Sequence, residues 1–411
     1  MWMGGMEGDL ARWWKEICKW VVLLASARAA RVLLVKQGND TPHRWLRTGD
    51  EAVAAMLGAI RAARESVRLE TYIFAASPVG ERFLAALVEA RKRGARVQVL
   101  VDALGSSDLE RRFWEPLTDA GGEFRWFNPV QMFRVTIRNH RKSLVCDERV
   151  AIIGGFNIAP EYEGDGVERG WCDHGMELRG PLARELAAAF DESFVRAEFR
   201  QQLFARLRKT EVKRCVSTPD GDLLLTGPGR GRNPIRRLMG QDIRRARDVR
   251  IASAYFSPTW VLRHELAGVV KRGGRVQLLM AGKSDVPISQ LACRGLYQGL
   301  LGAGVEIYEY QPQILHAKLF IVDDSAYVGS ANLDARSLNI NYEFLVRVRD
   351  PGVADGARAI FAEDLKHAQR IDPATWRRSR SVWEKLKERF AHFVVARLDP
   401  RIARMQMRDL R

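Results

Sequence analysis

The sequence predicts an α/β protein made of two duplicated α/β halves, each a mixed β-sheet flanked by helices, related by a pseudo-two-fold axis with one shared active site. Three observations lead to this prediction: an internal repeat, an alternation of strand and helix patterns, and a histidine–lysine motif placed alike in both halves. A chain of 411 residues with 46% hydrophobic content can bury a core in each of two domains.

The internal repeat appears as paired segments. The strand pattern of Val67–Phe74 matches that of Val249–Phe256. Each strand is followed by a helical stretch that ends in nearly the same residues, Arg93–Leu100 and Arg272–Leu279, where a glycine follows the helix and a buried strand begins. A repeat of this length predicts a duplicated domain, whereas a solenoid repeats over a much shorter period.

The repeat divides the chain into five segments. They are an N-terminal flank rich in Trp and basic residues (1–43), half 1 (44–213), a polar linker (214–221), half 2 (222–372) and a basic C-terminal tail (373–411). In the N-terminal flank the tryptophans are Trp13, Trp14 and Trp20. Alternating strands and helices within each half are typical of layered α/β folds.

In the tail, apolar residues recur at spacings of three and four, which predicts an amphipathic helix. They are Trp383, Leu386, Phe390, Phe393 and Val394. Such a stripe either packs against the protein's own core, the interpretation we favour, or lies among the headgroups of an anionic lipid surface. The N-terminal flank has the same two interpretations.

Composition narrows the partners and the setting. A formal net charge of +16 indicates a polyanionic partner, either nucleic acid or an anionic lipid surface. The cysteines are odd in number and lack a C-x-x-C pair, so we expect neither a disulfide framework nor a zinc knot, but a reducing compartment. The apolar run Trp20–Ala27 is far shorter than the about 20 residues that cross a bilayer, so we expect no transmembrane helix and no ordinary secretory signal.

The motif H-x-K-x4-D occurs once in each half. It consists of His140, Lys142 and Asp147 in half 1, and of His316, Lys318 and Asp323 in half 2. Alternate side chains of a strand share a face, so the histidine and lysine of each motif point the same way. The aspartates belong to the catalytic motif, but they fall on the opposite face at a turn, where we expect them mainly to cap the turn backbone.

A strand that presents His and Lys together suits phosphoryl transfer. The imidazole, with a reference pKa of about 6.5, attacks phosphorus or moves a proton near neutral pH. The lysine supplies a positive charge for phosphate oxygens that gain charge in the transition state. If both halves meet at one site, one histidine is the nucleophile and the other is the acid and then the base. Their pKa values must then be pushed apart by their neighbours.

Each motif runs into a small-residue loop, Gly154–Asn157 in half 1 and Gly329–Asn332 in half 2. Glycine lets the backbone approach a phosphate, and Asn and Ser side chains donate to its oxygens. The alternative is a plain turn with a helix cap. The candidate substrate-binding residues of these loops are Gly155, Asn157, Ser330 and Asn332.

An acid follows each loop, Asp173 in half 1 and Glu343 in half 2. A carboxylate bonded to the far nitrogen of an imidazole fixes its tautomer and raises its basicity, so these acids are candidates for orienting the catalytic histidines. The alternative is that each is a surface acid.

Together these motifs resemble the phospholipase D superfamily. The resemblance rests on the duplicated H-x-K-x4-D motif, the Gly-Gly-x-Asn and Gly-Ser-x-Asn loops, and the segments Glu70–Phe74 and Asn332–Ser337. Within the superfamily the chain is most similar to bacterial cardiolipin synthases of the short type without transmembrane helices, over roughly residues 44–372.

This resemblance implies a phosphohistidine intermediate, no metal or other cofactor, and transfer of a phosphatidyl group between two phosphatidylglycerols to give cardiolipin and glycerol. Carried over to this chain, it makes His140 the nucleophile and His316 the acid and base. The groups that hold phosphoryl oxygens would be Lys142, Lys318, Asn157 and Asn332. It also implies a peripheral protein on the cytoplasmic face of the bacterial inner membrane, in contact with anionic phospholipid.

Rival functions remain open at this point. The same chemistry serves lipid hydrolases and nucleic-acid phosphodiesterases of the superfamily, and a different class would be an inactive membrane-surface scaffold. Apolar residues before the first motif, Phe127, Val130, Met132 and Phe133, favour lipid, so we do not expect nucleic acid as the partner. The acceptor alcohol and the oligomeric state are left open.

Overall fold

The computed structural model describes residues 42–129, 137–197, 212–229 and 231–398, and the chain from His43 onward forms one compact unit. Some sequence predictions fall outside the described residues: those for Trp13, Trp14 and Trp20 in the N-terminal flank and for Val130, Met132 and Phe133 before the first motif.

Half 1 alternates strands and helices as its sequence predicts. Its elements are β1 (His43–Leu46), α2 (Gly49–Ala62), β2 (Ser66–Thr71), α3 (Pro78–Lys92), β3 (Arg96–Asp102), α4 (Glu115–Asp119), β4 (Glu123–Phe127), β5 (Ser143–Cys146), β6 (Val150–Gly154), β7 (Gly175–Arg179) and α5 (Pro181–Ala197). The helices begin at side chains that cap their first turn: Thr48 accepts from Glu51 N and Ser77 from Gly80 N.

Half 2 repeats this order, with a strand added at each end and a short helix, α10, added between β14 and β15. Its elements are β8 (Arg214–Thr218), β9 (Gly221–Thr226), α7 (Pro234–Ile243), β10 (Asp248–Ser253), α8 (Trp260–Lys271), β11 (Arg275–Ala281), α9 (Pro287–Gly302), β12 (Glu306–Tyr310), β13 (Lys318–Val322), β14 (Ser325–Gly329), α10 (Ala335–Asn339), β15 (Glu343–Arg349), α11 (Pro351–Lys366) and β16 (Ala368–Arg370). The tail forms α12 (Pro373–Ser379), α13 (Val382–Phe393) and a π-helical turn, η3 (Val394–Leu398).

Sheet topology confirms the duplication. The seven-stranded sheet of half 1 has the order β1-β7-β6-β5-β2-β3-β4, and the nine-stranded sheet of half 2 has the order β8-β9-β15-β14-β13-β10-β11-β12-β16. Without the edge strands β8 and β16, the two orders correspond strand by strand. Each sheet is mixed, because β2, β3 and β4, like β10, β11 and β12, pair in parallel while the other neighbours pair antiparallel. The predicted fold of two mixed α/β halves is therefore confirmed.

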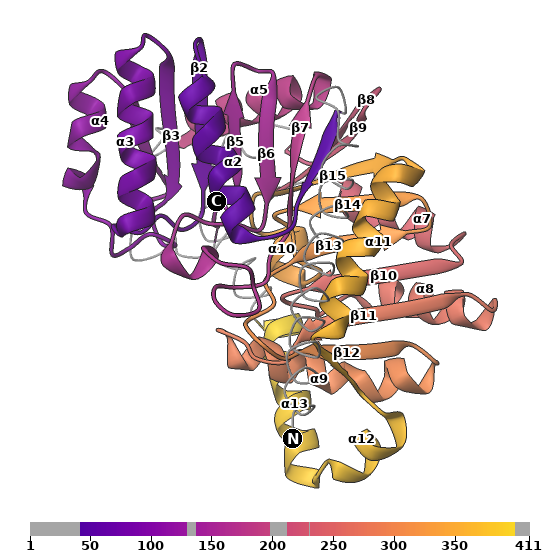
Figure 1. Cartoon of the computed structure of the whole chain (residues 1–411). Helices are drawn as coiled ribbons and strands as arrows, with labels where there is room; N and C mark the ends of the chain where they lie inside the picture. Colours follow the sequence, from indigo (N-terminus) through magenta and orange to yellow (C-terminus); the bar gives the residue numbers. More distant parts are fainter. Residues whose placement is uncertain (1–41, 130–136, 198–211, 230, 399–411) are drawn as a thin grey trace, which may run out of the picture. The chain divides into compact units, whose positions relative to one another are not determined.

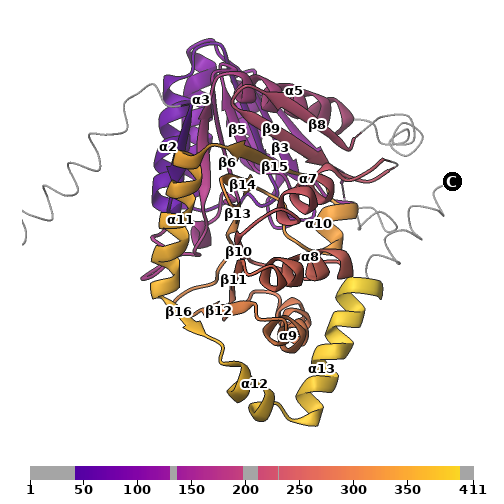
Figure 2. The same cartoon turned by 90° about the vertical axis from the view of Figure 1, so that its right-hand side faces the viewer.

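Alternate residues of the central strands enter cores on opposite faces of each sheet. In β5, Leu144 belongs to a cluster with α2 and α3, whereas Val145 belongs to a cluster with α5. In β13, Phe320 faces α7, α8 and α9, whereas Leu319 faces α11. Figures 1 and 2 show these helices on both sides of the sheets.

The two halves share a core. The cluster around α5 joins Val145 of β5 and Met176 of β7 to Leu223 of β9 and Val346 of β15. Residues expected to form a polar linker instead form β8, which pairs antiparallel with β9 through a turn closed by the Thr218 hydroxyl donating to Gly221 O. The connection between the halves is thus part of a sheet.

The tail helix corrects one expectation. We favoured packing of its apolar stripe on the core, but Trp383 is 74% exposed and Phe390 is 67% exposed. The opposite face of α13 packs on α9, where Glu388 and Ala391 are buried and Glu388 pairs with Arg380 at 2.7 Å. Because the buried face carries this polar contact, the apolar stripe points outward.

Candidate active site

The two motif histidines lie just before β5 and β13, in short segments that pair with the other half. Asn139 forms a parallel bridge with Tyr342, and His140 N donates to Tyr342 O at 3.0 Å. Leu315 bridges to Cys172 in the same way, and His316 N donates to Cys172 O at 2.7 Å. The same contact thus occurs twice with the halves exchanged, as a pseudo-two-fold axis at the site requires.

The carboxylates that orient the histidines are exchanged between the halves. His140 Nδ1 lies 2.9 Å from Glu343 Oε1, and His316 Nδ1 lies 2.7 Å from Asp173 Oδ2. Both carboxylates are fully buried, so neither is a surface acid. The contact of His316 with Asp173 is a hydrogen bond, whereas that of His140 with Glu343 is a close approach without hydrogen-bond geometry. A carboxylate at Nδ1 favours the proton on that nitrogen and leaves Nε2 as the reactive atom. Each half therefore supplies the catalytic imidazole of one pair and the carboxylate of the other.

Both imidazoles open into one cavity of about 580 Å³. Of the predicted site residues, His140, His316, Asn157 and Asn332 line it. The side chain of His140 is 14% exposed and that of His316 is 4% exposed, so the first ring is the more accessible of the two. Both halves therefore contribute to the wall of one cavity.

The motif lysines lie buried behind the histidines. Lys142 Nζ donates to His140 O at 2.8 Å. Lys318 Nζ donates to His316 O and lies 3.1 Å from His316 Nε2. Burial lowers the pKa of Lys142 to about 7 and that of Lys318 to about 8. An anionic phosphodiester in the cavity would favour the charged form of both lysines.

Burial also sets the charge of the imidazoles. It lowers the pKa of His140, against the opposing effect of the Glu343 carboxylate. Burial and the adjacent Lys318 ammonium lower the pKa of His316, against the Asp173 carboxylate. Both rings are thereby biased toward the neutral, nucleophilic form, and the negative charge of a bound diester would oppose that bias.

The two loop asparagines take part in the cavity wall in different ways. Asn157 Oδ1 accepts from Ile73 N at 3.0 Å, which fixes the orientation of its amide. Asn332 is buried, and its Oδ1 has no hydrogen-bond partner among the described residues. A buried amide oxygen of this kind calls for a donor, such as a substrate hydroxyl.

Gly155 and Ser330 are not in the cavity wall, and our expectation that they bind substrate is not met by their positions. A Cβ on Gly155 would lie 2.2 Å from Asp173 Oδ2, so the glycine makes room for that carboxylate. Ser330 Oγ accepts from Phe344 N at 3.1 Å, next to Glu343. Gly155 thus lies against the Asp173 carboxylate, and Ser330 lies against the backbone next to Glu343.

The motif aspartates lie outside the cavity at the turns between strands. Asp147 accepts from the backbone amides of Arg64, Glu65 and Ser66. Asp323 accepts from Arg247 N and Asp248 N. Both aspartates thus bind backbone, as we expected, but the amides belong to a neighbouring loop and not to the turn itself; their inclusion among the catalytic residues stays a prediction.

Aromatic rings surround the imidazoles and were missed as site residues. The ring of Tyr72 lies 4.9 Å from that of His140, and the rings of Tyr162 and Trp171 lie 5.2 Å and 5.4 Å from that of His316. Tyr72 and Trp171 stand inside segments already singled out by the repeat and by Asp173. Their closeness in sequence to these segments could have marked them as site residues. Aromatic residues near a motif are also common in cores, however, so this signal is weak.

Comparison with known proteins follows the same two halves. The family model described as "Cardiolipin synthase, PLD-like domain" matches residues 56–193 and 239–365. Cardiolipin synthase B of Escherichia coli strain K12 is 33% identical over 374 residues, covering 87% of this chain and 88% of the relative. Cardiolipin synthase 1 of Bacillus cereus is 30% identical over 372 residues, covering 87% of this chain and 72% of the relative.

A solved structure shares the fold. Phosphatidylserine synthase of Haemophilus influenzae Rd KW20 superposes with a TM-score of 0.70 at 15% sequence identity, covering 88% of this chain and 94% of that chain. At this identity the likeness concerns the fold alone. Among the described residues, no helix has the length and apolar character needed to cross a membrane.

Proposed function

The chain belongs to the cardiolipin synthase family with phospholipase D-like domains, and from this premise we propose how its two halves carry out the reaction. The activity is that of a phosphatidyltransferase of the cardiolipin synthase type. We propose that donor and acceptor are both phosphatidylglycerol and that the products are cardiolipin and glycerol. The observation that carries the mechanism is the exchange of carboxylates: two oriented imidazoles, one from each half, open into one cavity.

The first step forms a covalent intermediate. His140 Nε2 attacks the phosphorus of the donor, and the bond between phosphorus and the headgroup glycerol oxygen breaks. His316, protonated in the presence of the anionic diester, gives its proton to the leaving alkoxide, so that glycerol departs neutral. We assign attack to His140 because its ring is the more exposed to the cavity.

The second step reverses the proton transfer. His316, now neutral, takes the proton of the acceptor's glycerol hydroxyl, whose oxygen attacks phosphorus. The P–N bond to His140 breaks, and cardiolipin leaves with both imidazoles returned to their starting states. Lys142, Lys318 and the asparagines of the two loops are the groups that stabilise the phosphoryl oxygens in both steps.

Product analysis tests this function. Purified protein given vesicles of phosphatidylglycerol should form cardiolipin and release one glycerol for each cardiolipin, as measured by mass spectrometry and an enzymatic glycerol assay. Phosphatidic acid as the main product would make the protein a lipid hydrolase. Cleavage of single-stranded DNA with phosphatidylglycerol left intact would make it a nucleic-acid phosphodiesterase.

We further propose that the protein acts as a peripheral protein on an anionic bilayer, at the cytoplasmic face of the inner membrane, and that α13 is its docking helix. The exposed stripe of Trp383, Phe390 and Phe393 is flanked by the exposed basic residues Lys387 and Arg389. Aromatic rings among headgroups with cations beside them suit anionic lipid. The helix continues into η3, whose valines 394 and 395 line the catalytic cavity, so docking here would bring lipid to the chemistry.

Vesicle binding tests the docking helix. Trp383→Glu combined with Phe390→Glu should weaken co-sedimentation with phosphatidylglycerol vesicles about ten-fold or more. Val195→Glu is the matched control, because Val195 on α5 is also an exposed apolar residue, at 54%. Turnover of short-chain phosphatidylglycerol below its micellar concentration should be unchanged in both variants. Equal loss of vesicle binding in the control would remove α13 as the docking element.

A further inference from the structure

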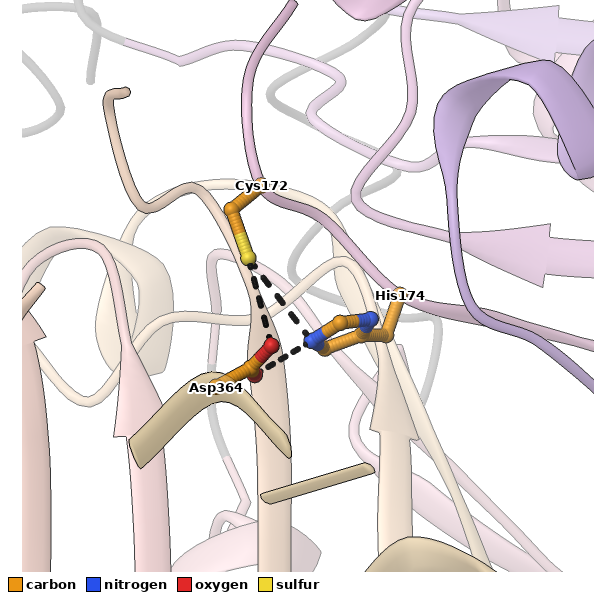
Figure 3. Close-up of side chains that lie close together, drawn as sticks. All are labelled: Cys172, His174 and Asp364. Carbon is orange, nitrogen blue, oxygen red and sulfur yellow. Dashed lines mark hydrogen bonds and ion pairs between the residues drawn. The ribbon is translucent and has the colours of Figure 1, made fainter. Parts of the chain in front are cut away.

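A buried cluster of a thiol, an imidazole and a carboxylate lies behind the active site, at the contact between the halves. Cys172 Sγ lies 3.9 Å from His174 Nε2 and 3.7 Å from Asp364 Oδ1, and His174 Nε2 lies 2.7 Å from Asp364 Oδ2 (Figure 3). Cys172 and His174 precede β7 of half 1, whereas Asp364 comes from α11 of half 2. None of the three lines the catalytic cavity, so the reaction does not account for them.

The other ring nitrogen of His174, Nδ1, already has a hydrogen-bond partner. His174 Nδ1 lies 2.9 Å from Arg47 O, which can only accept, so Nδ1 carries the proton. Nε2 and the carboxylate lie 2.7 Å apart, so a proton or a metal cation must lie between them. A ring held by a backbone carbonyl on one nitrogen, with the other nitrogen facing a thiol and a carboxylate, is the usual arrangement of a metal-binding histidine.

The duplicated fold does not require polar groups at this place. Gly154 pairs with Gly175 and Gly329 with Leu345, so residues around β7 correspond to those 170 positions later around β15. The pseudo-symmetric counterparts of Cys172 and His174 are thus Tyr342 and Phe344. Since α5 begins at Pro181 and α11 at Pro351, the counterpart of Asp364 is Phe194. All three counterparts are buried aromatic residues.

We propose that Cys172, His174 and Asp364 form a structural binding site for a transition-metal ion, with zinc(II) as the expected ion. A thiolate, a carboxylate and a neutral imidazole are ligands that zinc prefers. Binding releases the thiol proton and the proton between Nε2 and the carboxylate, so two positive charges replace two protons. The loaded cluster is electrically neutral, which suits its burial.

The spacing of the three groups is close to that of a tetrahedral site. Zinc bonds of about 2.3 Å to sulfur and about 2.0 Å to nitrogen and oxygen place such ligand atoms about 3.3 to 3.6 Å apart. The distance from Sγ to Nε2 is slightly longer than this range, the distance from Nε2 to Oδ2 is shorter, and one ligand atom from each residue lies within 4.8 Å of the other two. Loading therefore requires Asp364 to move away from His174 by about half an ångström, a shift within the rotation of one carboxylate.

The ion would support the catalytic centre through the backbone. The segment from 172 to 174 carries Asp173, which orients His316, and Cys172 N donates to Ile314 O at 2.9 Å. Because the ligands on either side of Asp173 would be fixed to α11, the carboxylate would be held in place at the contact between the halves. The ion itself would contact neither substrate nor phosphorus.

Metal analysis of the full chain tests the site. Protein purified without chelators and dialysed against micromolar zinc chloride should hold about one zinc per chain by mass spectrometry. Cys172→Ser should lower the zinc affinity at least ten-fold, whereas Cys293→Ser, another buried cysteine, should keep it. With cobalt(II) in place of zinc, wild type and Cys293→Ser should show the near-ultraviolet charge-transfer band of a cobalt–thiolate bond, and Cys172→Ser should lack it.

Two results would overturn the site. One is wild-type protein that holds less than about a tenth of an equivalent after dialysis; the other is a Cys172→Ser variant that holds as much zinc as wild type. Asp364→Asn, which keeps the shape of the side chain, provides a second variant in case the serine variant fails to fold. Zinc should raise the unfolding temperature of wild type and leave that of Asp364→Asn unchanged.

Discussion

The two halves hold the same pair of catalytic side chains over different interiors. Next to His140 the buried layer of half 1 is charged: Asn139 Nδ2 donates to Glu70 Oε1 at 2.6 Å, and Arg138 Nη1 lies 3.4 Å from Asp102 Oδ1. Burial raises the pKa of both carboxyl groups. In half 2 the corresponding positions are apolar: Ala252, Ala281, Ile314 and Leu315.

This difference separates what the chemistry needs from what the fold needs. Since half 2 packs without buried charges at these positions, the fold does not require them in half 1. The proposed mechanism requires two imidazoles with different protonation states, one neutral and one cationic. The interiors differ at these positions, yet burial lowers the pKa of both rings, and the groups next to each ring are the carboxylate from the other half and the motif lysines.

Replacing either histidine gives the largest expected effect and tests how unequal the halves are. Turnover of phosphatidylglycerol by His140→Ala and by His316→Ala should each fall by about 10⁴-fold or more, because each ring acts in both steps. A p-nitrophenyl phosphodiester distinguishes them, since its leaving group needs no proton. His316→Ala should still release a burst of p-nitrophenol. If only His140→Ala released a burst, His316 would be the nucleophile and His140 the acid and base.

Removing the orienting carboxylates should cost about 10²- to 10⁴-fold in kcat, somewhat less than losing a ring. The pH profile of kcat/KM then separates the halves. Glu343 raises the pKa of His140, so Glu343→Gln should move the acid limb, where His140 becomes neutral, to lower pH. Asp173 raises the pKa of His316, which burial holds well below its ordinary value, so Asp173→Asn should move the limb at which His316 loses its proton to still lower pH. If each variant moved the limb assigned to the other, the histidine roles would be reversed.

The buried charges of half 1 should matter most for stability. Asp102 accepts from Leu104 N, Gly105 N and Asn139 N, and it faces Arg138. Asp102→Ala should therefore lower the free energy of unfolding by about 3 to 5 kcal/mol, measured by urea titration. As a control, Asp108→Ala at an exposed position should change it by less than about 0.5 kcal/mol. A neutral Asp102→Ala would mean that the charged layer contributes nothing to folding.

A smaller effect on activity is expected from the loop positions behind the carboxylates. Gly155→Ala would push its Cβ against Asp173, so kcat should fall about 10- to 100-fold while the unfolding temperature changes little. The counterpart change, Ser330→Ala, removes a bond to Phe344 N but adds no clash, and should cost less. Equal losses in both variants would show that the clash is not what matters at position 155.

The sequence predicts most of the fold and many of the side chains that meet at the candidate site, because both depend on local patterns. Period-two strands, helix caps and the spacing of His and Lys on one strand are properties of a few neighbouring residues. The repeat then supplies the symmetry. It does not supply the exchange of Asp173 and Glu343 between the halves, which depends on tertiary bridges such as that of Asn139 with Tyr342.

The exposure of the apolar stripe on α13 was not predicted for a similar reason, because it depends on tertiary contacts. An apolar stripe on a helix shows that one face differs from the other, but not which face the fold covers. On α13 the face that packs on α9 contains Glu388. This residue pairs with Arg380 and lies against Gly295 of α9. That choice depends on a glycine almost a hundred residues away, beyond the reach of helical periodicity.

Replacing the motif aspartates should have the smallest effect on kcat, and the effect should be nearly equal in the two halves. Asp147 accepts from the amides of Ser66 and its two preceding residues, and Asp323 from those of Arg247 and Asp248. These amides lie near solvent, so water replaces part of what is lost. Asp147→Ala and Asp323→Ala should each lower the free energy of unfolding by about 1 to 2 kcal/mol and leave kcat within about two-fold of wild type. A loss of kcat above about a hundred-fold in a folded variant would place these aspartates in the catalytic set, because no backbone contact at a distant turn accounts for a loss of that size.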